Sequence, residues 1–393
     1  MAERLLSVVS RPAGFGWQAR NAARIRSADG AVAELTRGAD QVLRCGPATA
    51  KRDGMKTTLH QFFRPTKAEM DEMLANARIC YDANVLLNIY RYSEETQSGL
   101  LDVFNAFVDR TYLPHQVALE YARNRAITLV EQIDLCQNTE AAFKKVLKDF
   151  IEPKNKQPFL SAKSAKALDK VMHELASKRR VLESMISEDK YAELFSSLFG
   201  QKIGAAPDDE TLNQLHDQAA DRYTKKTPPG YSDLKKKSVP GVYGDYILWR
   251  QLMDIAKEEK RDFIFVTDDS KDDWWLIHKG KTIGPRPEIL EEFHRETDQR
   301  IWLFNSQGFL IATKKVGSTQ VSESVINEVG EYLIAQTAVL ALEDKLSSPD
   351  IDREEANGSV SGEKLSCQQV ERAKMSRFVE DESLRETKPR RQM

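Results

Sequence analysis

Residues 79–87 read Ile-Cys-Tyr-Asp-Ala-Asn-Val-Leu-Leu, a short apolar run that ends in an acid and then resumes as a second apolar segment. The pattern predicts a buried strand at 79–81, Asp82 at its carboxyl end and a helix over 85–92. In open α/β folds chemistry gathers outside the carboxyl ends of the strands, which makes Asp82 a candidate functional residue. Capping of the next helix explains an Asp at this position equally well. Three further acids in comparable positions favour the functional interpretation.

The composition bounds the class of protein. The chain has 393 residues, of which 41% are hydrophobic and 30% charged, so a sizeable core is expected. A formal net charge of -2 means that any basic binding surface must be local. The four cysteines lack the spacing of a disulfide scaffold or a zinc site, which favours a reducing compartment. Because no stretch approaches the roughly 18 consecutive apolar residues of a membrane span, we expect a soluble, cytoplasmic protein.

The sequence divides into segments of different character. Residues 1–66 form an Arg-rich leader with weak order, and Met55 is a plausible start of the native product. The main domain is expected over 67–320, with a helical insertion at about 137–226. A C-terminal helix at 321–346 precedes a polar, disordered tail at 347–393. Further strands are predicted at 112–113, 262–267 (apolar over 263–266) and 301–304, and helices at 67–77, 94–107, 241–259 and 287–296.

Two acids lie on predicted helices. Glu120 lies about 9 Å along its helix from Pro114, at 1.5 Å per residue. Asp245 is in line with Leu248 and Leu252, the spacing of a stripe that faces the core. A carboxylate on an apolar stripe is costly unless it is paired or bound to a metal. Capping competes as an explanation, since Asp245 also lies near the helix start.

Asp268 follows the strand 263–266 as Asp82 follows the strand 79–81. Two acids at strand ends and two on helices can converge at one edge of a parallel sheet. Clustered carboxylates need a counter-charge to stay ionised together, and Mg²⁺ or Mn²⁺ with oxygen ligands supplies it. Such an ion can activate a water against a phosphodiester and neutralise the leaving oxygen. Asp269 and Asp273 are either supporting groups or turn acids.

Residues 224–239 are basic and rich in turns, with five lysines against one acid. The run Pro228-Pro229-Gly230 rules out a helix at this point. A solvated surface and a nucleic-acid contact explain the segment equally well. The candidate contacts are Tyr231, Lys235, Lys236 and Lys237.

Taken together, these motifs resemble the PIN-like nuclease domains, in the larger variety that carries a helical insertion. The resemblance rests on Asp82-Ala83-Asn84, 113–120, 228–233, 243–249, 265–275 and 284–288, and covers residues 67 to about 315. It implies a three-layer α/β/α sandwich around a mainly parallel sheet. It also implies an endoribonuclease that cuts single-stranded RNA with Mg²⁺ or Mn²⁺.

Carried over residue by residue, the resemblance assigns four metal carboxylates: Asp82, Glu120, Asp245 and Asp268. Asn84 would support the first of these, and Asp269 can take the place of Asp268 because the two acids are adjacent. Asp273 would be a supporting group, and Arg286 would join the nucleic-acid contacts. A homodimer and a regulating inhibitor or activator protein are further expectations.

Three other interpretations stay open. The motif Asp82-Ala83-Asn84 superficially resembles the haloacid-dehalogenase-type phosphatases, although Asn84 stands where their second acid is expected. A catalytically silent nucleic-acid-binding module is a second alternative. The third is a nuclease that acts on structured DNA, as some related folds do. The long insertion departs from the minimal family pattern and leaves the substrate class open.

Overall fold

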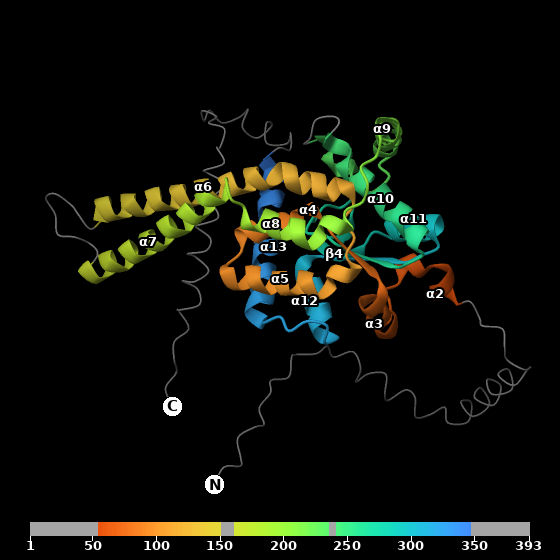
Figure 1. Ribbon diagram of the computed structural model, residues 1–393, viewed down its shortest axis with the longest axis horizontal. Helices are drawn as coiled ribbons and strands as arrows, with labels where there is room; N and C mark the ends of the chain where they lie inside the picture. The colour runs from red at the N-terminus through yellow and green to blue at the C-terminus, as the bar shows by residue number, and fades with distance from the viewer. Residues whose placement is uncertain (1–53, 151–160, 236–240, 347–393) are drawn as a thin grey trace, which may run out of the picture. The chain divides into compact units, whose positions relative to one another are not determined.

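The computed structural model describes residues 54–150, 161–235 and 241–346 (Figure 1). The chain divides into two compact units, residues 1–58 and 59–393. In the first unit the described residues are 54–58, which contain the short helix α2 (Met55–Thr58). The predicted tail at 347–393 lies outside the described residues, as does the leader up to residue 53.

The second unit holds the sheet and the remaining helices. Its α-helices are α3 (Lys67–Asn76), α4 (Ala83–Leu87), α5 (Glu94–Phe107), α6 (His115–Phe150), α7 (Ala162–Met185), α8 (Lys190–Phe199), α9 (Asp209–Thr224), α10 (Gly244–Glu259), α11 (Pro287–Thr297), α12 (Ser306–Lys315) and α13 (Glu323–Leu346). Its strands are β1 (Arg78–Tyr81), β2 (Phe263–Val266), β3 (Trp275–His278), β4 (Lys281–Pro285) and β5 (Ile301–Phe304). Short 3-10 helices are η1 (His60–Phe62), η2 (Asn88–Arg91), η3 (Val108–Arg110), η4 (Gly200–Lys202), η5 (Tyr231–Lys235) and η6 (Gly241–Tyr243).

The central sheet has the strand order β1-β2-β5, and both pairings are parallel. Every residue of β2 is buried, as a continuous apolar run between two neighbours predicts. The strand predicted at 112–113 is reduced to isolated bridges, from Thr111 to Ile79 and from Leu113 to Ile203. All three strands of the sheet therefore have their carboxyl ends at one edge.

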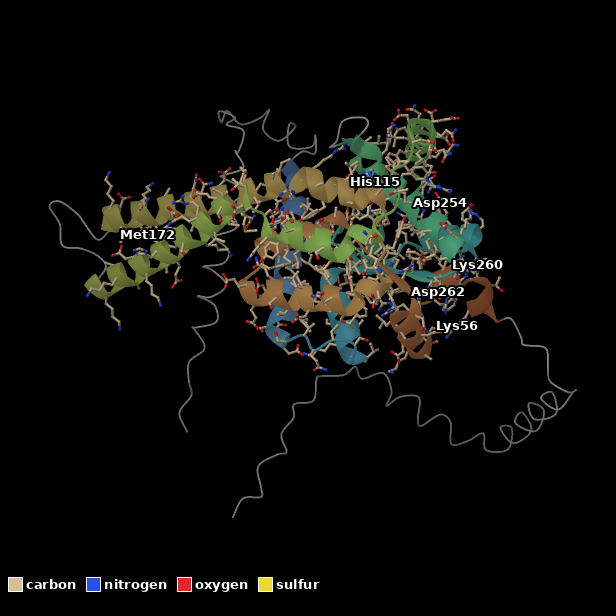
Figure 2. All side chains as sticks on the ribbon, in the orientation of Figure 1. Lys56, His115, Met172, Asp254, Lys260 and Asp262 are labelled. Atoms are coloured by element: carbon tan, nitrogen blue, oxygen red, sulfur yellow. The ribbon has the colours of Figure 1, made fainter. Side chains whose placement is uncertain are left out.

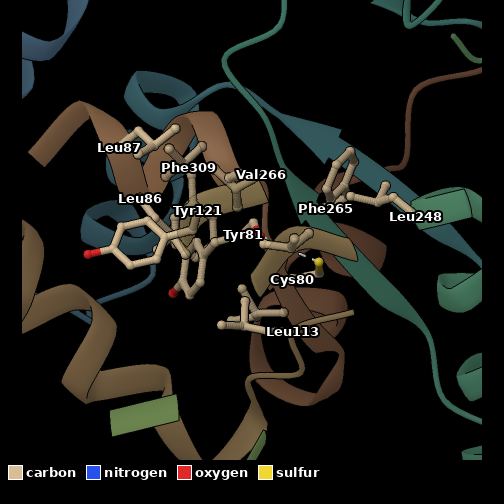
Figure 3. Packing of buried hydrophobic residues seen from close by; sticks show 14 of the residues in the cluster. Cys80, Tyr81, Leu86, Leu87, Leu113, Tyr121, Leu248, Phe265, Val266 and Phe309 are labelled. Atoms are coloured by element: carbon tan, nitrogen blue, oxygen red, sulfur yellow. Dashed lines mark hydrogen bonds between the residues drawn. The ribbon is translucent and has the colours of Figure 1, made fainter. Parts of the chain in front are cut away.

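Helices cover both faces of this sheet. Side chains alternate between the two faces of a strand, and aromatic contacts follow this alternation. Tyr81 packs edge-on against Phe309 of α12, whereas Phe263 packs against Phe293 of α11. Figure 3 shows Tyr81 and Phe309 together, with Phe265 turned to the other side. The three-layer α/β/α arrangement expected from the sequence is confirmed.

Local sequence signals set several helix boundaries. Thr66 and Glu69 form a capping box at the start of α3, and Ser93 caps α5, whose bounds match the prediction. The predicted helix over 85–92 is shorter, because α4 ends at Leu87 and continues as η2. Among the strands and the α-helices longer than about one turn, the hairpin strands β3 and β4 and the helix α12 were not predicted from the sequence. The hairpin turns at Lys279 and Gly280, both with positive φ, which is the geometry of a tight two-residue turn.

The predicted insertion begins inside a helix. α6 runs without a break from the sheet edge to Phe150, so Glu120 and the first part of the insertion share one helix. α7 packs back along α6 (Figure 1). The two helices form an arm, defined as residues 141–150 and 161–181, and Met172 lies on its α7 side (Figure 2). At the base of the arm Arg179 Nε lies 3.0 Å from Glu140 Oε1. None of the arm side chains whose exposure is described is buried.

Residues 59–66, which the sequence assigns to the leader, pack within the second unit. The His60 ring contacts the His294 ring of α11 edge-on, with centroids 4.5 Å apart. The Arg64 guanidinium donates to the carbonyl of Ile283 in β4. Ordered packing therefore begins ahead of residue 67.

Two of the cysteines and all of the helices named above lie within the described ranges. Cys80 and Cys136 are buried free thiols, and the other two cysteines lie outside these ranges. Among the described helices, none combines the length and the apolar character needed to cross a bilayer.

Candidate active site

Asp82 lies directly after β1 and caps α4. One carboxylate oxygen, Oδ1, accepts a hydrogen bond from the Ala83 N–H at 2.7 Å. The other, Oδ2, accepts from Thr267 Oγ1 at 2.6 Å and from Asn84 Nδ2 at 2.7 Å. Asp82 therefore caps α4, which was one of the two roles expected from the sequence. Its hydrogen bond with Thr267 also connects it to the end of β2. Both strand ends are fixed to each other by side chains.

Burial raises the pKa of the Asp82 carboxyl to about 7. The hydrogen bond from Thr267 opposes that rise, and the nearby carboxylates Glu120 and Asp269 add to it. Asp82, Glu120 and Asp269, which come from three separate elements, are therefore near enough for their negative charges to repel one another. Carboxylates grouped in this way attract a cation.

Glu120 lies on α6, a turn and a half beyond His115, where the helix begins (Figure 2). Its Oε1 accepts a hydrogen bond from Gln116 Nε2 at 2.6 Å, one turn earlier on the helix. A Cβ at Gly244, the first residue of α10, would clash with that same oxygen. The glycine therefore lets α10 begin against Glu120.

Asp245 follows Gly244 in the first turn of α10, and Leu248 and Leu252 of the same stripe are buried. Asp245 is therefore on the side of α10 that faces the core. A Cβ at Gly230, where φ is 94°, would lie 2.9 Å from the Asp245 Cβ. The basic segment thus passes directly beside this carboxylate at Gly230.

Asp268 and Asp269, the two adjacent acids after β2, contact different residues. Asp268 is 7% exposed. Its Oδ1 accepts from the Ser306 N–H at 2.8 Å, and its Oδ2 from Ser306 Oγ at 2.8 Å and Asn88 Nδ2 at 2.9 Å. Asp269 is the acid whose charge acts on Asp82. The charges of Glu120 and Asp269 act on Asp82, and those of Asp269 and Asp245 act on Lys271. Asp268 is instead hydrogen-bonded to Ser306 at the start of α12.

Lys271 lies inside this group of acids. Its Nζ is 2.7 Å from Asp269 Oδ2 and 2.7 Å from Asp233 Oδ1. Burial alone lowers the pKa of the Lys271 ammonium, but Asp269, Asp245 and Asp233 together raise it well above its usual value. The side chain is therefore a fixed positive charge among carboxylates.

Asp273, expected from the sequence to be a supporting group, is fully buried and holds the segment that contains Gly230. Its Oδ2 accepts hydrogen bonds from the N–H groups of Gly230 at 3.1 Å and Ser232 at 2.9 Å. Asp272 Oδ1 accepts from Ser232 Oγ at 3.0 Å. The acids after Asp269 thus fix the backbone next to Asp245.

Two of the predicted nucleic-acid contacts bind each other. Arg286 Nη1 donates to the Tyr231 hydroxyl at 3.2 Å and to the Asp272 carbonyl at 2.8 Å. The rest of its guanidinium binds Glu288, with Nη2 to Oε1 at 2.8 Å. Arg286 thus holds Tyr231 beside the acid-bearing segment. The side chains of the three predicted lysine contacts, Lys235, Lys236 and Lys237, lie outside the described residues.

The donor set fits a hard divalent cation in chemical type, because all of its ligand atoms are carboxylate oxygens. Burial is the main cause of the raised pKa of Asp82, and the charges of Glu120 and Asp269 add to it. A bound cation would relieve that repulsion. As the side chains stand, no three His, Cys, Asp or Glu residues in the described ranges form a group that could hold a metal ion. One reason is visible in the contacts, since Asp269 is bound to Lys271.

Several residues of this site were not singled out from the sequence. They are Gln116, Thr267, Asp233, Gly244 and Lys271. A local signal exists for two of them. Gln116 precedes Glu120 by one helical turn, which lets their side chains meet, and Gly244 precedes a core-facing acid. The partners of Lys271 come from distant segments, so spacing alone could not show them.

A family model described as "PIN like domain" matches residues 78–289, which is more than half of the chain. The chain belongs to this family. The resemblance expected from the sequence is confirmed, and a PIN like domain generally indicates a metal-dependent nuclease fold. No curated protein and no solved structure matches the chain.

The PIN like domain match contains all of the clustered carboxylates, Asp82, Glu120, Asp245 and Asp269. It ends at residue 289, before β5, α12 and α13. Asp268 therefore has its main partner, Ser306, outside the matched segment.

Proposed function

We propose that this PIN like domain is an endoribonuclease that hydrolyses phosphodiester bonds of single-stranded RNA with Mg²⁺ or Mn²⁺. The observation that carries the proposal is that carboxylates from four elements lie around Asp82, Lys271 and the start of α10, near enough for their charges to act on Asp82 or on Lys271. These carboxylates are Asp82 after β1, Glu120 on α6, Asp245 on α10 and Asp269 after β2. The raised pKa of Asp82 supports their closeness.

In this proposal Asp82, Glu120 and Asp245 would hold the ion, and Asp269, not Asp268, is the acid after β2 that adjoins them. A bound Mg²⁺ or Mn²⁺ supplies positive charge to the attacked phosphate and acidifies the attacking water. Thr267 and Asn84 orient the Asp82 carboxylate through their hydrogen bonds. Fixed orientation matters because catalysis depends on groups that need no rearrangement during the reaction.

The basic segment 224–239 supports a nucleic-acid substrate. Its backbone at Gly230 and Ser232 is fixed by Asp273, beside Asp245. In this proposal the lysines of the segment contact the phosphates of the substrate, and such contacts make affinity salt-dependent. The preference for RNA over DNA comes from the family resemblance.

A cleavage assay on the full chain tests the proposal. Single-stranded RNA, single-stranded DNA and duplex DNA are each incubated with Mn²⁺, Mg²⁺ or EDTA. We expect metal-dependent cutting of single-stranded RNA, reduced by about 100-fold or more in Asp82→Asn and Asp245→Asn, the scale of losing one group that stabilises the transition state. Asp254→Asn is the matched control, since Asp254 lies exposed on the same helix as Asp245.

The outcomes separate the alternatives. Cleavage retained in both Asp82→Asn and Asp245→Asn would refute the carboxylate site. RNA binding without cleavage by the wild type would favour a silent binding module, and preferential cutting of duplex DNA would favour a structure-specific DNA nuclease. Hydrolysis of a small phosphate monoester would support the phosphatase alternative, which the amide of Asn84 disfavours.

We also propose a reducing, cytoplasmic setting, supported by the free thiols of Cys80 and Cys136. The homodimer and the regulating protein partner stay predictions.

A further inference from the structure

Lys271 contacts the acid cluster through both its backbone and its side chain. The backbone N–H donates to Asp269 Oδ1 at 2.9 Å, and the Nζ lies 2.7 Å from Asp269 Oδ2. Both oxygens of Asp269 are therefore bound by the same residue. The same Nζ lies 2.7 Å from Asp233 Oδ1, so it bridges two carboxylates from segments far apart in the chain.

The environment of this ammonium group is that of a cation site. The Asp233 side chain is 2% exposed and the Lys271 side chain 26% exposed, so solvent contributes little screening at their contact. Asp245 contributes a third negative charge nearby. A divalent ion that bridges two carboxylates would occupy the same kind of position, between oxygens that carry opposite charge to its own.

Asp82 and Glu120 differ from Asp269, because their hydrogen-bond partners are uncharged. Asp82 accepts hydrogen bonds from the uncharged groups of Ala83, Asn84 and Thr267. Glu120 accepts from the Gln116 amide. These neutral donors orient the two carboxylates and leave their charge in place, and each carboxylate oxygen has a second lone pair for a further partner.

We propose that Lys271 is a built-in cation that takes the place of a second divalent ion, so that this site binds one metal ion and not two. The inference rests on the proposed function, because it concerns the metal of that same site. Sites with two metals place the ions about 3.5–4 Å apart and share carboxylates between them. Here the side chain that would be shared, Asp269, is held by Lys271. Asp82, Glu120 and Asp245 would hold the single ion.

Lys271 is in this view a positioning residue. It fixes Asp269 after β2 and, through Asp233, the 3-10 turn η5 that carries Tyr231. Unlike a metal ion, a covalently attached ammonium cannot dissociate from these carboxylates into solution. The basic segment next to the site therefore keeps its anchor when the protein is free of metal.

Mn²⁺ binding to the full chain tests the inference without any measurement of activity. Electron paramagnetic resonance of free Mn²⁺ gives the number of ions bound per chain. We expect one ion for the wild type, two for Lys271→Met and one for Lys271→Arg, which keeps a positive charge. In the double variant Lys271→Met with Asp233→Asn we expect one again, because one of the two bridged carboxylates is gone. Circular dichroism confirms that each variant is folded.

Two ions bound to the wild type would overturn the inference, whether or not the lysine variants fold. One ion bound to a folded Lys271→Met protein would overturn it as well. The outcome is distinct from that of the cleavage assay. A wild type that binds two ions and cuts RNA refutes the role of Lys271 alone, whereas a wild type that binds one ion and cuts no nucleic acid refutes the nuclease alone.

Discussion

At the residue scale, the neighbours Asp268 and Asp269 have different roles in the structure. Burial raises the pKa of Asp268, and the hydrogen bonds from Ser306 and Asn88 oppose that rise. These bonds join the end of β2 to the start of α12 and to η2. Asp269 faces the acid cluster and Lys271. One residue holds elements together and the other belongs to the proposed active site.

This difference gives a testable pair of variants. We expect Asp268→Asn to lower the free energy of unfolding by about 2 kcal/mol, because an amide places a donor against the donors Ser306 and Asn88. We expect Asp269→Asn to have the smaller effect on stability and to reduce RNA cleavage strongly. Urea unfolding and the cleavage assay, run on both variants, measure the two effects. A stable but inactive Asp268→Asn protein would return Asp268 to the set of metal ligands.

At the element scale, one carboxylate attaches α13 to α5. Glu328 Oε1 accepts from the Ser93 N–H at 2.6 Å, and Oε2 accepts from Ser93 Oγ at 2.5 Å and Thr96 Oγ1 at 2.8 Å. Ser93 is the N-cap of α5, where unpaired N–H groups and the helix dipole favour a negative charge. Burial raises the pKa of Glu328, but these hydrogen bonds outweigh it and the pKa lies below its usual value.

The contribution of Glu328 to the free energy of unfolding depends on pH. Because the pKa of Glu328 is lower in the folded than in the unfolded protein, its contribution is present above the unfolded value of 4.5 and is lost as the pH falls through the folded value. We expect Glu328→Gln to lower the free energy of unfolding by about 1 kcal/mol at pH 7. Urea unfolding at pH 7 and pH 3.5 measures this gap, which narrows at the lower pH.

Glu331→Gln is the matched control for that experiment, since Glu331 lies exposed on the same helix. A gap between Glu328→Gln and the wild type that stays constant with pH would contradict the charge-based attachment of α13.

At the scale of the whole second unit, the arm of α6 and α7 stands apart from the core. Its described side chains are exposed or partly exposed, and its base is tied by Arg179 and Glu140. The arm presents many basic side chains to solvent. Those described as exposed are Lys144, Lys145, Lys148, Lys163, Lys166, Lys170, Lys178 and Arg180. Such a surface suits a phosphate backbone.

Replacement of residues 143–178 by a short Gly/Ser linker tests the independence of the arm. We expect the variant to fold with a melting temperature within about 5 °C of the wild type, because little core packing is removed. Cleavage of a short single-stranded RNA should be kept, while affinity for a longer strand falls and depends less on salt. Thermal unfolding and binding at several salt concentrations measure these effects. Loss of folding would show instead that the arm is part of the core structure.

The sequence by itself predicted the strands of the central sheet and the acids that follow β1 and β2, but not the hairpin β3–β4 or α12. Continuous apolar runs predict β1, β2 and β5, because strands buried on both faces need apolar side chains throughout, and the acids that follow β1 and β2 lie at one edge because the strands are parallel. Tertiary structure decided which acids meet. Asp268 turns to Ser306 and Lys271 joins Asp269 to Asp233. Hydrogen bonds and ion pairs between segments far apart in the chain select these partners, and no periodicity along the chain records them.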